Sequence, residues 1–567
     1  MKYSVMAGAL MLGLSSFCAV AESADEDVPQ RPPAVSTEDL LNIMIQEGLI
    51  DEAKVREIIK KAQDKTRAGF EGSVDIVEES EADEPQDVDS GVVRVPYIPK
   101  YIKEEIRDQV RMELREEVVG DVMARAEKEA WGVPGTNPSW TKKIKITGDI
   151  RLRGENTIFD DKNNNTVSRN AYLDFNKIND RGKLNNDETD RMNITKDRLR
   201  LRTRMRLQIK AEVTPGIKAE ARIVTGNSSD PVSENQTLGN YGESFEISFD
   251  RANLQYKSYE NDFELVGGRF KNPFFHTDLV WDGDYHFDGI ASTYWFNRGD
   301  SWEDDEIQMD PYIRGGIFPL DEISKSTNDK WLYAIQTGFH YTWWDQDVFS
   351  IGLAYYHFDN VTGEYNELNG NEKDYTAAAY LQKGNTLYNI KNDFEGEDVL
   401  FGLLGEYQLV NLTAQYDIAA FAPHHVILTL DLVQNIGLDE DEMAKTFDDT
   451  NNNTVFNTSV KSAGETGIEE RDFGYQLGVT FGWPIVAKRG DWQASLIIRN
   501  LERDAVIDAF ADSDFHMGGT DGKGFIVQGK YGITEETWLQ VKWLSSESID
   551  GADLGVDIYQ VDVNARF

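Results

Sequence analysis

Residues 198–207 have the sequence RLRLRTRMRL, in which arginines alternate strictly with mostly apolar residues. In a β-strand this alternation places the guanidiniums of Arg198, Arg200, Arg202, Arg204 and Arg206 on one face. At about 6.7 Å per two residues the row is about 27 Å long, close to the ~30 Å hydrocarbon core of a bilayer. Because arginine is strongly unfavourable on a lipid-facing surface, the stretch predicts a transmembrane strand whose basic face points into a barrel.

The same alternation recurs along residues 143–567, where we count about sixteen such segments. Short turns are found at residues 214–216, 258–262, 345–347 and 534–537. Between them lie long connections at residues 154–197, 224–243, 271–289, 359–398, 436–470 and 502–523. Sorting of loops by length onto two sides is typical of outer-membrane barrels and unusual in soluble sandwiches. The sequence therefore predicts an all-β fold, a transmembrane antiparallel β-barrel of about sixteen strands.

The composition excludes several classes of protein. The chain has 100 Asp and Glu residues against 58 Lys and Arg residues, a formal net charge of −42, so no nucleic-acid partner is expected. Its single cysteine, Cys18, lies in a segment expected to be removed, which excludes disulfides and thiolate sites in the mature chain. The seven histidines show no H-E-x-x-H pattern and no nucleophile elbow is present. We predict no enzyme activity, no catalytic or metal-binding residues and no cofactor.

The N-terminal part is predicted to consist of four segments. Residues 1–21 combine a charged start, an apolar run and a small-residue cleavage site, as in a secretory signal peptide. Residues 22–64 are expected to form a short helical hairpin, and the acidic residues 65–96 a flexible linker. Residues 97–134 carry an apolar stripe that recurs every four positions, which predicts an amphipathic helix. The helix could be a periplasmic trimerisation stalk, or it could pack on or plug its own barrel, and both interpretations stay open.

The last strand of the chain is amphipathic and ends on an aromatic residue. One face carries Tyr559, Val561, Val563, Ala565 and Phe567, while polar residues occupy the other. This pattern resembles the signal that outer-membrane barrels present to their assembly machinery. We therefore expect that machinery to be a partner, together with outer-membrane lipid and lipopolysaccharide.

Residues 267–275 read GGRFKNPFF, followed by DLVWDGD at 278–284 and by Asp288-Gly289. This stretch resembles the putative porin family of Gram-negative bacteria. The N-terminal helical segments, the sequence ITGDIRLR at 146–153 and the terminal phenylalanine are also similar, so the resemblance covers most of the mature chain. It implies a passive channel in the outer membrane with a periplasmic N-terminal region.

A set of basic residues and a set of acidic residues are expected to face each other across the lumen. Arg151 and Arg153 on the neighbouring strand extend the basic wall. The connection 271–289 contributes Asp278, Asp282, Asp284 and Asp288, and in porins the corresponding loop commonly folds inward as a constriction. We predict a transverse field that orients polar solutes. A second interpretation is that the arginine row pairs with its neighbours and is mainly structural, and the net ion selectivity stays open.

These features predict a water-filled channel for passive diffusion of small hydrophilic solutes and ions. The alternative is a plugged barrel that tethers the outer membrane to the cell wall or to partner proteins through residues 22–142. A stalk would make the protein a homotrimer. Two similar stretches, DDKNNNTV at 160–167 and DDTNNNTV at 448–455, could bind calcium, but Asn and Asp are also ordinary turn residues.

Overall fold

The computed structural model describes residues 143–567, apart from residues 186–187, 227–228, 297–307, 325, 344–346, 393–397, 450–454 and 457–469. The chain divides into two compact units, Met1–Pro138 and Ser139–Phe567, and the described residues all belong to the second. The signal peptide, the helical hairpin, the acidic linker and the amphipathic helix predicted within residues 1–134 lie outside the described residues. Those assignments therefore remain predictions.

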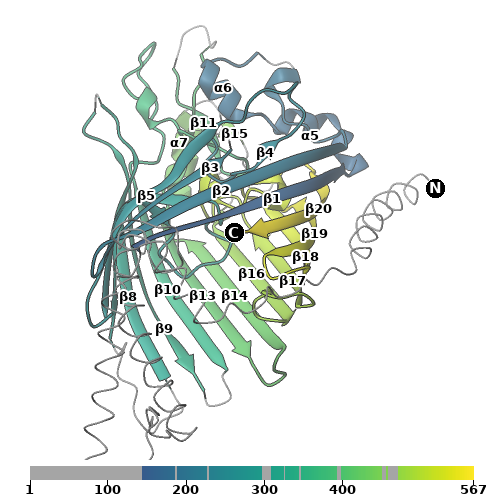
Figure 1. Ribbon diagram of the computed structural model, residues 1–567. Helices are drawn as coiled ribbons and strands as arrows, with labels where there is room; N and C mark the ends of the chain where they lie inside the picture. Colours follow the sequence, from purple (N-terminus) through teal and green to yellow (C-terminus); the bar gives the residue numbers. More distant parts are fainter. Residues whose placement is uncertain are drawn as a thin grey trace, which may run out of the picture. The chain divides into compact units, whose positions relative to one another are not determined.

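The described residues form a closed antiparallel barrel (Figure 1). Seventeen strands share the main sheet, and one of them, β4 (Gln236–Thr237), is a two-residue addition that pairs with β2. The other sixteen follow one another around the ring, and the last pairs with the first. They are β1 (Ile144–Phe159), β2 (Arg198–Thr214), β3 (Ile217–Thr225), β5 (Ile247–Lys257), β6 (Phe263–Lys271), β7 (His286–Trp295), β8 (Gln308–Asp321), β9 (Lys330–Thr342), β10 (Val348–Asp359), β13 (Gln408–Ile418), β14 (His425–Asn435), β16 (Phe473–Gly482), β17 (Trp492–Leu501), β18 (Gly522–Gly532), β19 (Thr537–Ser548) and β20 (Gly555–Arg566). The predicted fold and strand number are confirmed.

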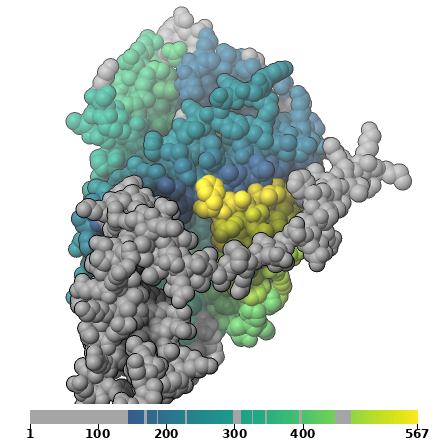
Figure 2. Space-filling model, viewed as in Figure 1, coloured from purple at the N-terminus to yellow at the C-terminus, as the bar shows by residue number. Residues whose placement is uncertain are grey.

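The barrel closes where the C-terminal strand meets the first strand. Figure 2 shows this seam, with the yellow C-terminal strands against the blue start of the barrel. The register runs from Asp149 opposite Arg566 to Phe159 opposite Val556. Below it, Phe567 and Gly148 exchange both backbone hydrogen bonds, at 2.8 and 2.9 Å. Closure leaves no sheet edge unpaired along this seam, as a membrane barrel requires.

Most of the connections alternate in length as predicted; the exceptions at the short-turn end are residues 296–307 and 483–491. The long ones are residues 160–197, 226–246, 272–285, 360–407, 436–472 and 502–521, all at one end of the barrel, where two shorter connections, 322–329 and 549–554, also lie. The predicted boundary at residue 154 is wrong, because β1 continues to Phe159. Gly154 reads as a turn residue, but Glu155 and Thr157 keep the alternation and point inward, where both are buried.

The long connections carry the remaining elements. These are the helices α5 (Thr166–Ala171), α6 (Phe175–Arg181) and α7 (Glu440–Asp449), the 3₁₀ turns η2 (Asp161–Asn164), η3 (Glu188–Asp190), η4 (Asp374–Thr376), η5 (Asp508–Phe510) and η6 (Phe515–Met517), and a small sheet of β11 (Leu387–Asn389), β12 (Phe401–Leu403) and β15 (Val455–Phe456). No helix in the described part of the chain is long and apolar enough to cross a membrane.

The first asparagine-rich stretch is held by its own turn. The side chain of Asp160 accepts a hydrogen bond of 2.9 Å from the Lys162 amide. The buried Asn163 donates to the carbonyls of Ile194 and Gly555, each at 2.9 Å. Asn and Asp thus act here as turn residues. The second stretch, 448–455, falls largely outside the described residues, so calcium binding there stays untested.

The two faces of the wall differ as the alternation of β2 predicts. Leu199 and Leu201 are 60% and 59% exposed on the outside, whereas Arg204 is 8% exposed inside. Many other large apolar side chains are exposed around the ring, including Ile150, Leu254, Ile290, Ile317, Leu353, Leu477, Leu496 and Val563. An apolar outer belt around a charged interior is what the bilayer selects.

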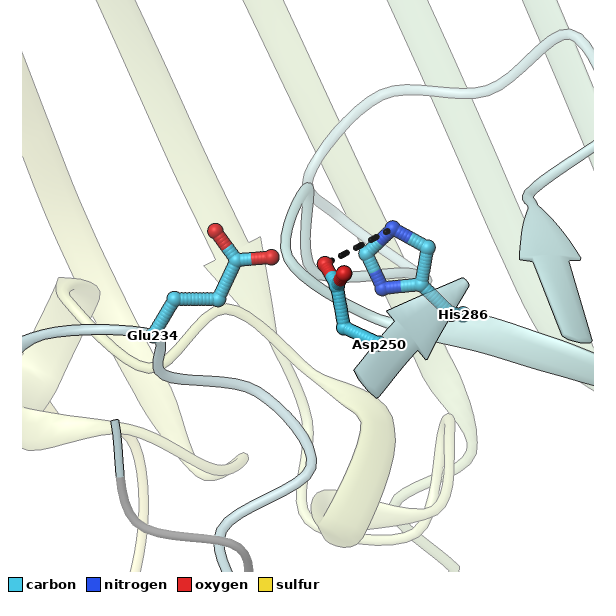
Figure 3. A group of neighbouring side chains, drawn as sticks. All are labelled: Glu234, Asp250 and His286. Carbon is cyan, nitrogen blue, oxygen red and sulfur yellow. Dashed lines mark ion pairs between the residues drawn. The ribbon is translucent and has the colours of Figure 1, made fainter. Parts of the chain in front are cut away.

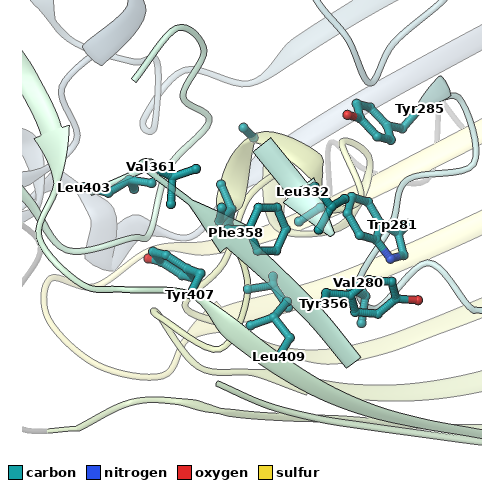
Figure 4. Close-up of a cluster of buried hydrophobic side chains, with 14 of the residues drawn as sticks. Val280, Trp281, Tyr285, Leu332, Tyr356, Phe358, Val361, Leu403, Tyr407 and Leu409 are labelled. Carbon is teal, nitrogen blue, oxygen red and sulfur yellow. The ribbon is translucent and has the colours of Figure 1, made fainter. Parts of the chain in front are cut away.

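The inner wall at the long-loop end is apolar on the side opposite the arginines (Figure 4). Leu332 of β9, Tyr356 of β10 and Tyr407, just before β13, are fully buried. From the loop 272–285, Trp281 packs onto this surface, with its ring centroid 5.3 Å from that of Tyr356 and 5.6 Å from that of Tyr285. Packed apolar loops therefore fill one side of the mouth, and the charged residues are left on the side of β1 to β3.

Candidate functional site: a basic wall and the loop that crosses the barrel

The seven predicted wall arginines form two adjacent columns on β1 and β2. In the antiparallel register, Arg151 lies opposite Arg204 and Arg153 lies opposite Arg202. The other three members, Arg198, Arg200 and Arg206, follow on the same face of β2. Since β2 runs from the long-loop end to the short-turn end, Arg198 lies nearest the long loops and Arg206 deepest in the barrel.

The loop 272–285 crosses the interior instead of extending outward. The amide of Phe275 donates to Gln336 on β9, and the Gln336 side chain donates back to the Phe275 carbonyl, both at 2.8 Å. Further on, the Thr277 hydroxyl donates to Asp431 on β14 at 2.6 Å. Because β14 is nine strands along the ring from β2, these bonds hold the loop against the wall that faces the arginines.

Two glycines face each other in the strands on either side of this loop. Gly268 of β6 lies opposite Gly289 of β7, and both have left-handed φ angles, of 115° and 138°. A Cβ on Gly268 would lie 2.3 Å from the Ala252 carbonyl oxygen, and one on Gly289 would lie 2.2 Å from that of Ile317. Only glycine fits such backbone contacts, which gives a physical reason for these residues of the GGRF…DG pattern.

Asp284 reaches the basic wall from the returning arm of the loop. Its Oδ1 lies 3.3 Å from Nη1 of Arg204 and 3.9 Å from Nη1 of Arg206. Burial opposes ionisation of Asp284, but Arg204 and the neighbouring guanidiniums hold its pKa below the usual range. An ionised carboxylate on the crossing loop thus faces arginines on the wall.

The other three predicted acids of the loop lie in different surroundings. Asp282 accepts backbone hydrogen bonds from Asp284, at 2.7 Å, and from Ser513, at 2.8 Å, and so fastens the loop to its neighbour. Burial and the charge of Asp284 raise the pKa of Asp282 well above its usual value. Asp278 is exposed. Asp288 is half exposed on β7 and pairs with Arg269 at 2.8 Å, so it does not join the group around Arg204.

Further carboxylates on the wall and loops neutralise much of the basic wall. Asp149 bonds Arg206 at 2.7 Å and Arg204 at 3.2 Å, and Asp562 of β20 bonds Arg153 at 2.8 Å. The alternation could have revealed Asp149 and Glu155, since they share the inward face of β1 with Arg151 and Arg153. Nothing in the local sequence marks the loop residues Glu234 and Asp514, which reach the wall only through the folding of distant loops.

Glu234, Asp250 and His286 bring three ligand-type atoms within 4.8 Å of one another (Figure 3). Arg222 already lies among them. Its Nη2 is 2.6 Å from Glu234 and 3.1 Å from Nε2 of His286, and it also bonds Asp250. A divalent cation bound by the same donors would be repelled by this guanidinium, so the geometry fits an internal ion-pair network better than a metal site. Burial, and then Asp284, raise the pKa of Glu234 to about 8.

Four of the predicted assembly residues lie on the outer face of β20, and the fifth, Phe567, directly follows this strand. Tyr559 and Val563 are exposed beside Phe567, while Gln560 and Asp562 between them are buried inside the barrel. The amphipathic pattern is thus present in the folded strand, and its recognition by assembly machinery stays a prediction.

A family model described as putative porin matches residues 34–567. The chain belongs to the putative porin family. Family and fold together indicate a channel of the outer membrane. None of the curated proteins compared with this porin matches it.

Several solved structures match this chain, all with low sequence identity and TM-scores below 0.5. The high-pH structure of Pseudomonas putida OprB has 11% identity and a TM-score of 0.43, covering 77% of this porin and 97% of that chain. The Acinetobacter baumannii channel DcaP has 12% identity and a TM-score of 0.38, covering 75% and 97%. Salmonella typhi OmpF in complex with daunomycin has 10% identity and a TM-score of 0.37, also covering 75% and 97%. At these identities the likeness concerns the fold, which the strand pairing of this porin already establishes.

Proposed function

We propose that this porin forms a water-filled channel through which small hydrophilic solutes and ions diffuse passively, along the basic wall and past Asp284. The contact of 3.3 Å between Asp284 and Arg204 carries the proposal, since it joins the crossing loop to the wall at one level of the lumen. Asp284 and the paired guanidiniums and carboxylates beside it give this stretch of the wall a strongly polar surface. Polar and charged solutes can pass along such a surface, whereas apolar ones must displace ordered water.

The apolar loops define where that passage runs. They occupy the mouth next to β9, β10 and β13, as the burial of Leu332, Tyr356 and Tyr407 indicates. The side of β1 to β3 keeps charged, partly exposed side chains such as Arg200 and Arg206. Water and solutes are therefore expected to pass close to the arginines.

Liposome swelling tests passive diffusion directly. The refolded protein is placed in liposomes, and swelling rates are compared for neutral sugars of increasing size. The proposal predicts swelling that falls steadily with the size of the sugar. Swelling no faster than that of protein-free liposomes, from a barrel shown to be folded by heat-modifiable migration on a gel, would contradict it.

The apolar cluster favours the second candidate, a plugged barrel that acts as a tether. Trp281, Phe358 and Phe510 lie together at the loop end of the barrel, with ring centroids 5.6 to 6.2 Å apart, and such packing resists opening. A tether would bind the cell wall or partner proteins through its N-terminal region and need not conduct. Crosslinking of the full chain in native membranes tests this contact, and also the homotrimer that the sequence predicts.

A further inference from the structure

The arginine row is neutralised unevenly along its length. Deep in the barrel, Arg204 lies within 4 Å of two carboxylates, those of Asp149 and Asp284, and also of the carboxyl group of Glu234. Near the long loops, Arg200 and Arg202 share one carboxylate, that of Glu155. Among the described residues, Arg198 has no ion-pair partner within 4 Å. The surplus of positive charge therefore lies at the outer end of the row and not at the constriction.

A cavity of about 510 Å³ opens at that outer end. Arg198, Arg200 and Arg202 line it from β2, Gln560 from β20, and Tyr380 and Gln382 from the connection 360–407. The lining consists of residues of the inner wall and the long connections, so the cavity is reached from the lumen. Its volume lies in the range of sites that hold small organic ligands.

The acids that line this cavity already have partners. Asp174 pairs with Lys177 within its own helix, and Asp514 pairs with Arg153 at 3.0 Å. Asp230 accepts from the Val232 amide at 3.1 Å and bonds Tyr380. Glu155, the fourth acid of the lining, pairs with both Arg200 and Arg202, and Asp514 acts on Arg202 from a greater distance. The lining acids thus offset part of the charge of these two arginines, whereas Arg198 keeps its positive charge without an ion-pair partner among the described residues.

Two of the arginines that line the cavity also have a donor without a protein partner. The Nε atoms of Arg200 and Arg202 are buried and have no hydrogen-bond partner within the part of the chain that the structure describes, as is also true of Arg151 and Arg204 deeper in the barrel. A buried N–H without a partner costs about 1–3 kcal/mol, so these donors need water or a ligand. Guanidiniums bind carboxylate and phosphate oxygens best, because charge and fork geometry both match.

We propose that this cavity is a binding site for small organic anions that carry a carboxylate or phosphate group, held by Arg198, Arg200 and Arg202. The rest of the lining accommodates an organic body, since Tyr380 and Gln382 offer hydrogen bonds and Phe159 and Met517 offer apolar contact. The inference deepens the proposed function by naming the class of solute that is concentrated at the outer mouth. Only its role in transport rests on that function, because binding does not require conduction.

Calorimetry on the refolded full-length protein tests the site. Succinate is titrated at low salt, with succinamide as the uncharged probe and glycerol 3-phosphate as the phosphate probe. The variant R200S/R202S is expected to bind both anions at least about tenfold more weakly, since each lost charge-assisted contact is worth about that factor. The variant R200K/R202K should retain part of the affinity, because the charge stays while the fork is lost.

Lys210→Ser is the matched control. Lys210 lies on the same face of β2, near the short-turn end, and pairs with Glu220 at 3.5 Å outside the cavity. Its substitution should leave anion affinity unchanged. Equal affinity of wild type and R200S/R202S, no saturable heat with either anion, or equal binding of succinamide would overturn the proposal.

Conductance separates this inference from the proposed function. If the protein binds succinate but forms no pore, the anion site is supported and the proposed channel function is refuted. The opposite result is also informative. If the protein conducts but shows no saturable succinate binding, and if succinate added on the long-loop side does not reduce the current, the channel function is supported and the anion site is refuted.

Discussion

Asp284→Asn removes the carboxylate that faces the basic wall from the crossing loop. The pKa of Asp284 is held below its usual range by Arg204, so the side chain is ionised at neutral pH and the substitution removes a full charge. The barrel should still fold, because Arg204 retains Asp149 at 3.2 Å and Glu234 at 3.8 Å. The lumen beside Arg204 and Arg206 becomes more positive, and the channel should become more selective for anions.

The size of the change follows from Coulomb's law. A monovalent ion passing about 6 Å from Asp284 interacts with it by about 0.7 kcal/mol in water, and by about 0.4 kcal/mol when screened at 0.1 M salt. Cations lose this attraction and anions lose the same repulsion, so the anion-to-cation permeability ratio should rise about fourfold. At 1 M salt the interaction falls to about 0.1 kcal/mol, and the ratio should change by less than about 1.5-fold.

Zero-current potentials across KCl gradients, recorded at pH 9 and at low and at high salt, measure this ratio. At pH 9 Glu234, whose pKa is raised to about 8 partly by Asp284, is largely ionised in both proteins and does not offset the substitution. Asp288→Asn is the control, because Asp288 carries the same charge in the adjoining strand but pairs with Arg269, away from Arg204. The anion-to-cation permeability ratio of the Asp288→Asn variant should stay at the wild-type value. A ratio for Asp284→Asn that equals those of wild type and Asp288→Asn at 0.1 M would refute the idea that Asp284 faces the path of the ions.

Three further perturbations follow from the same geometry. The pKa of Glu234 is raised to about 8, mainly by burial and then by the charge of Asp284, so this side chain becomes negatively charged as the pH rises through 8. Reversal potentials should therefore move towards cation preference between pH 7 and 9. The variant Glu234→Gln should not show this pH-dependent change. Asp431→Ala removes the acceptor of the Thr277 hydroxyl and leaves buried donors unpaired, at a cost of about 1–3 kcal/mol. Because the loop 272–285 is then held less firmly, single-channel records should show a larger and noisier conductance. An unchanged record would show that the hydrogen bond between Thr277 and Asp431 does not hold the loop. Deletion of Phe567 removes both backbone bonds to Gly148, so the yield of heat-modifiable barrel in the membrane fraction should fall, whereas Phe567→Tyr should preserve it.

The fold could be predicted from the sequence because two independent constraints act on the same residues. In β2 the strand period and the cost of arginine in lipid allow one orientation, which places Leu199 outside and Arg204 inside. The lengths of the connections and the aromatic end of β20 then add information on topology. Local pattern was sufficient wherever the membrane determines which face of a strand points outward.

The site could be predicted only in part, since its contacts are made by segments far apart in the chain. Asp284 and Asp288 look equivalent in the sequence, yet Asp284 lies on the loop beside Arg204, whereas Asp288 lies in β7 and pairs with Arg269. Glu234 and Asp514 reach the wall from other loops, at positions that depend on loop packing. The loop around Trp281 is expected to fold inward, but nothing in its local sequence indicates the apolar surface on which it packs, because distant strands supply that surface.

Single-channel conductance of the refolded mature protein in a planar bilayer tests the central claim most directly, followed by the zero-current potential across a KCl gradient. We predict discrete conductance steps, with a sign of the potential that reverses or shifts towards anions when Asp284 is neutralised. A correctly folded barrel that shows no steps at any salt concentration would contradict the channel and leave the plugged tether as the function of this porin.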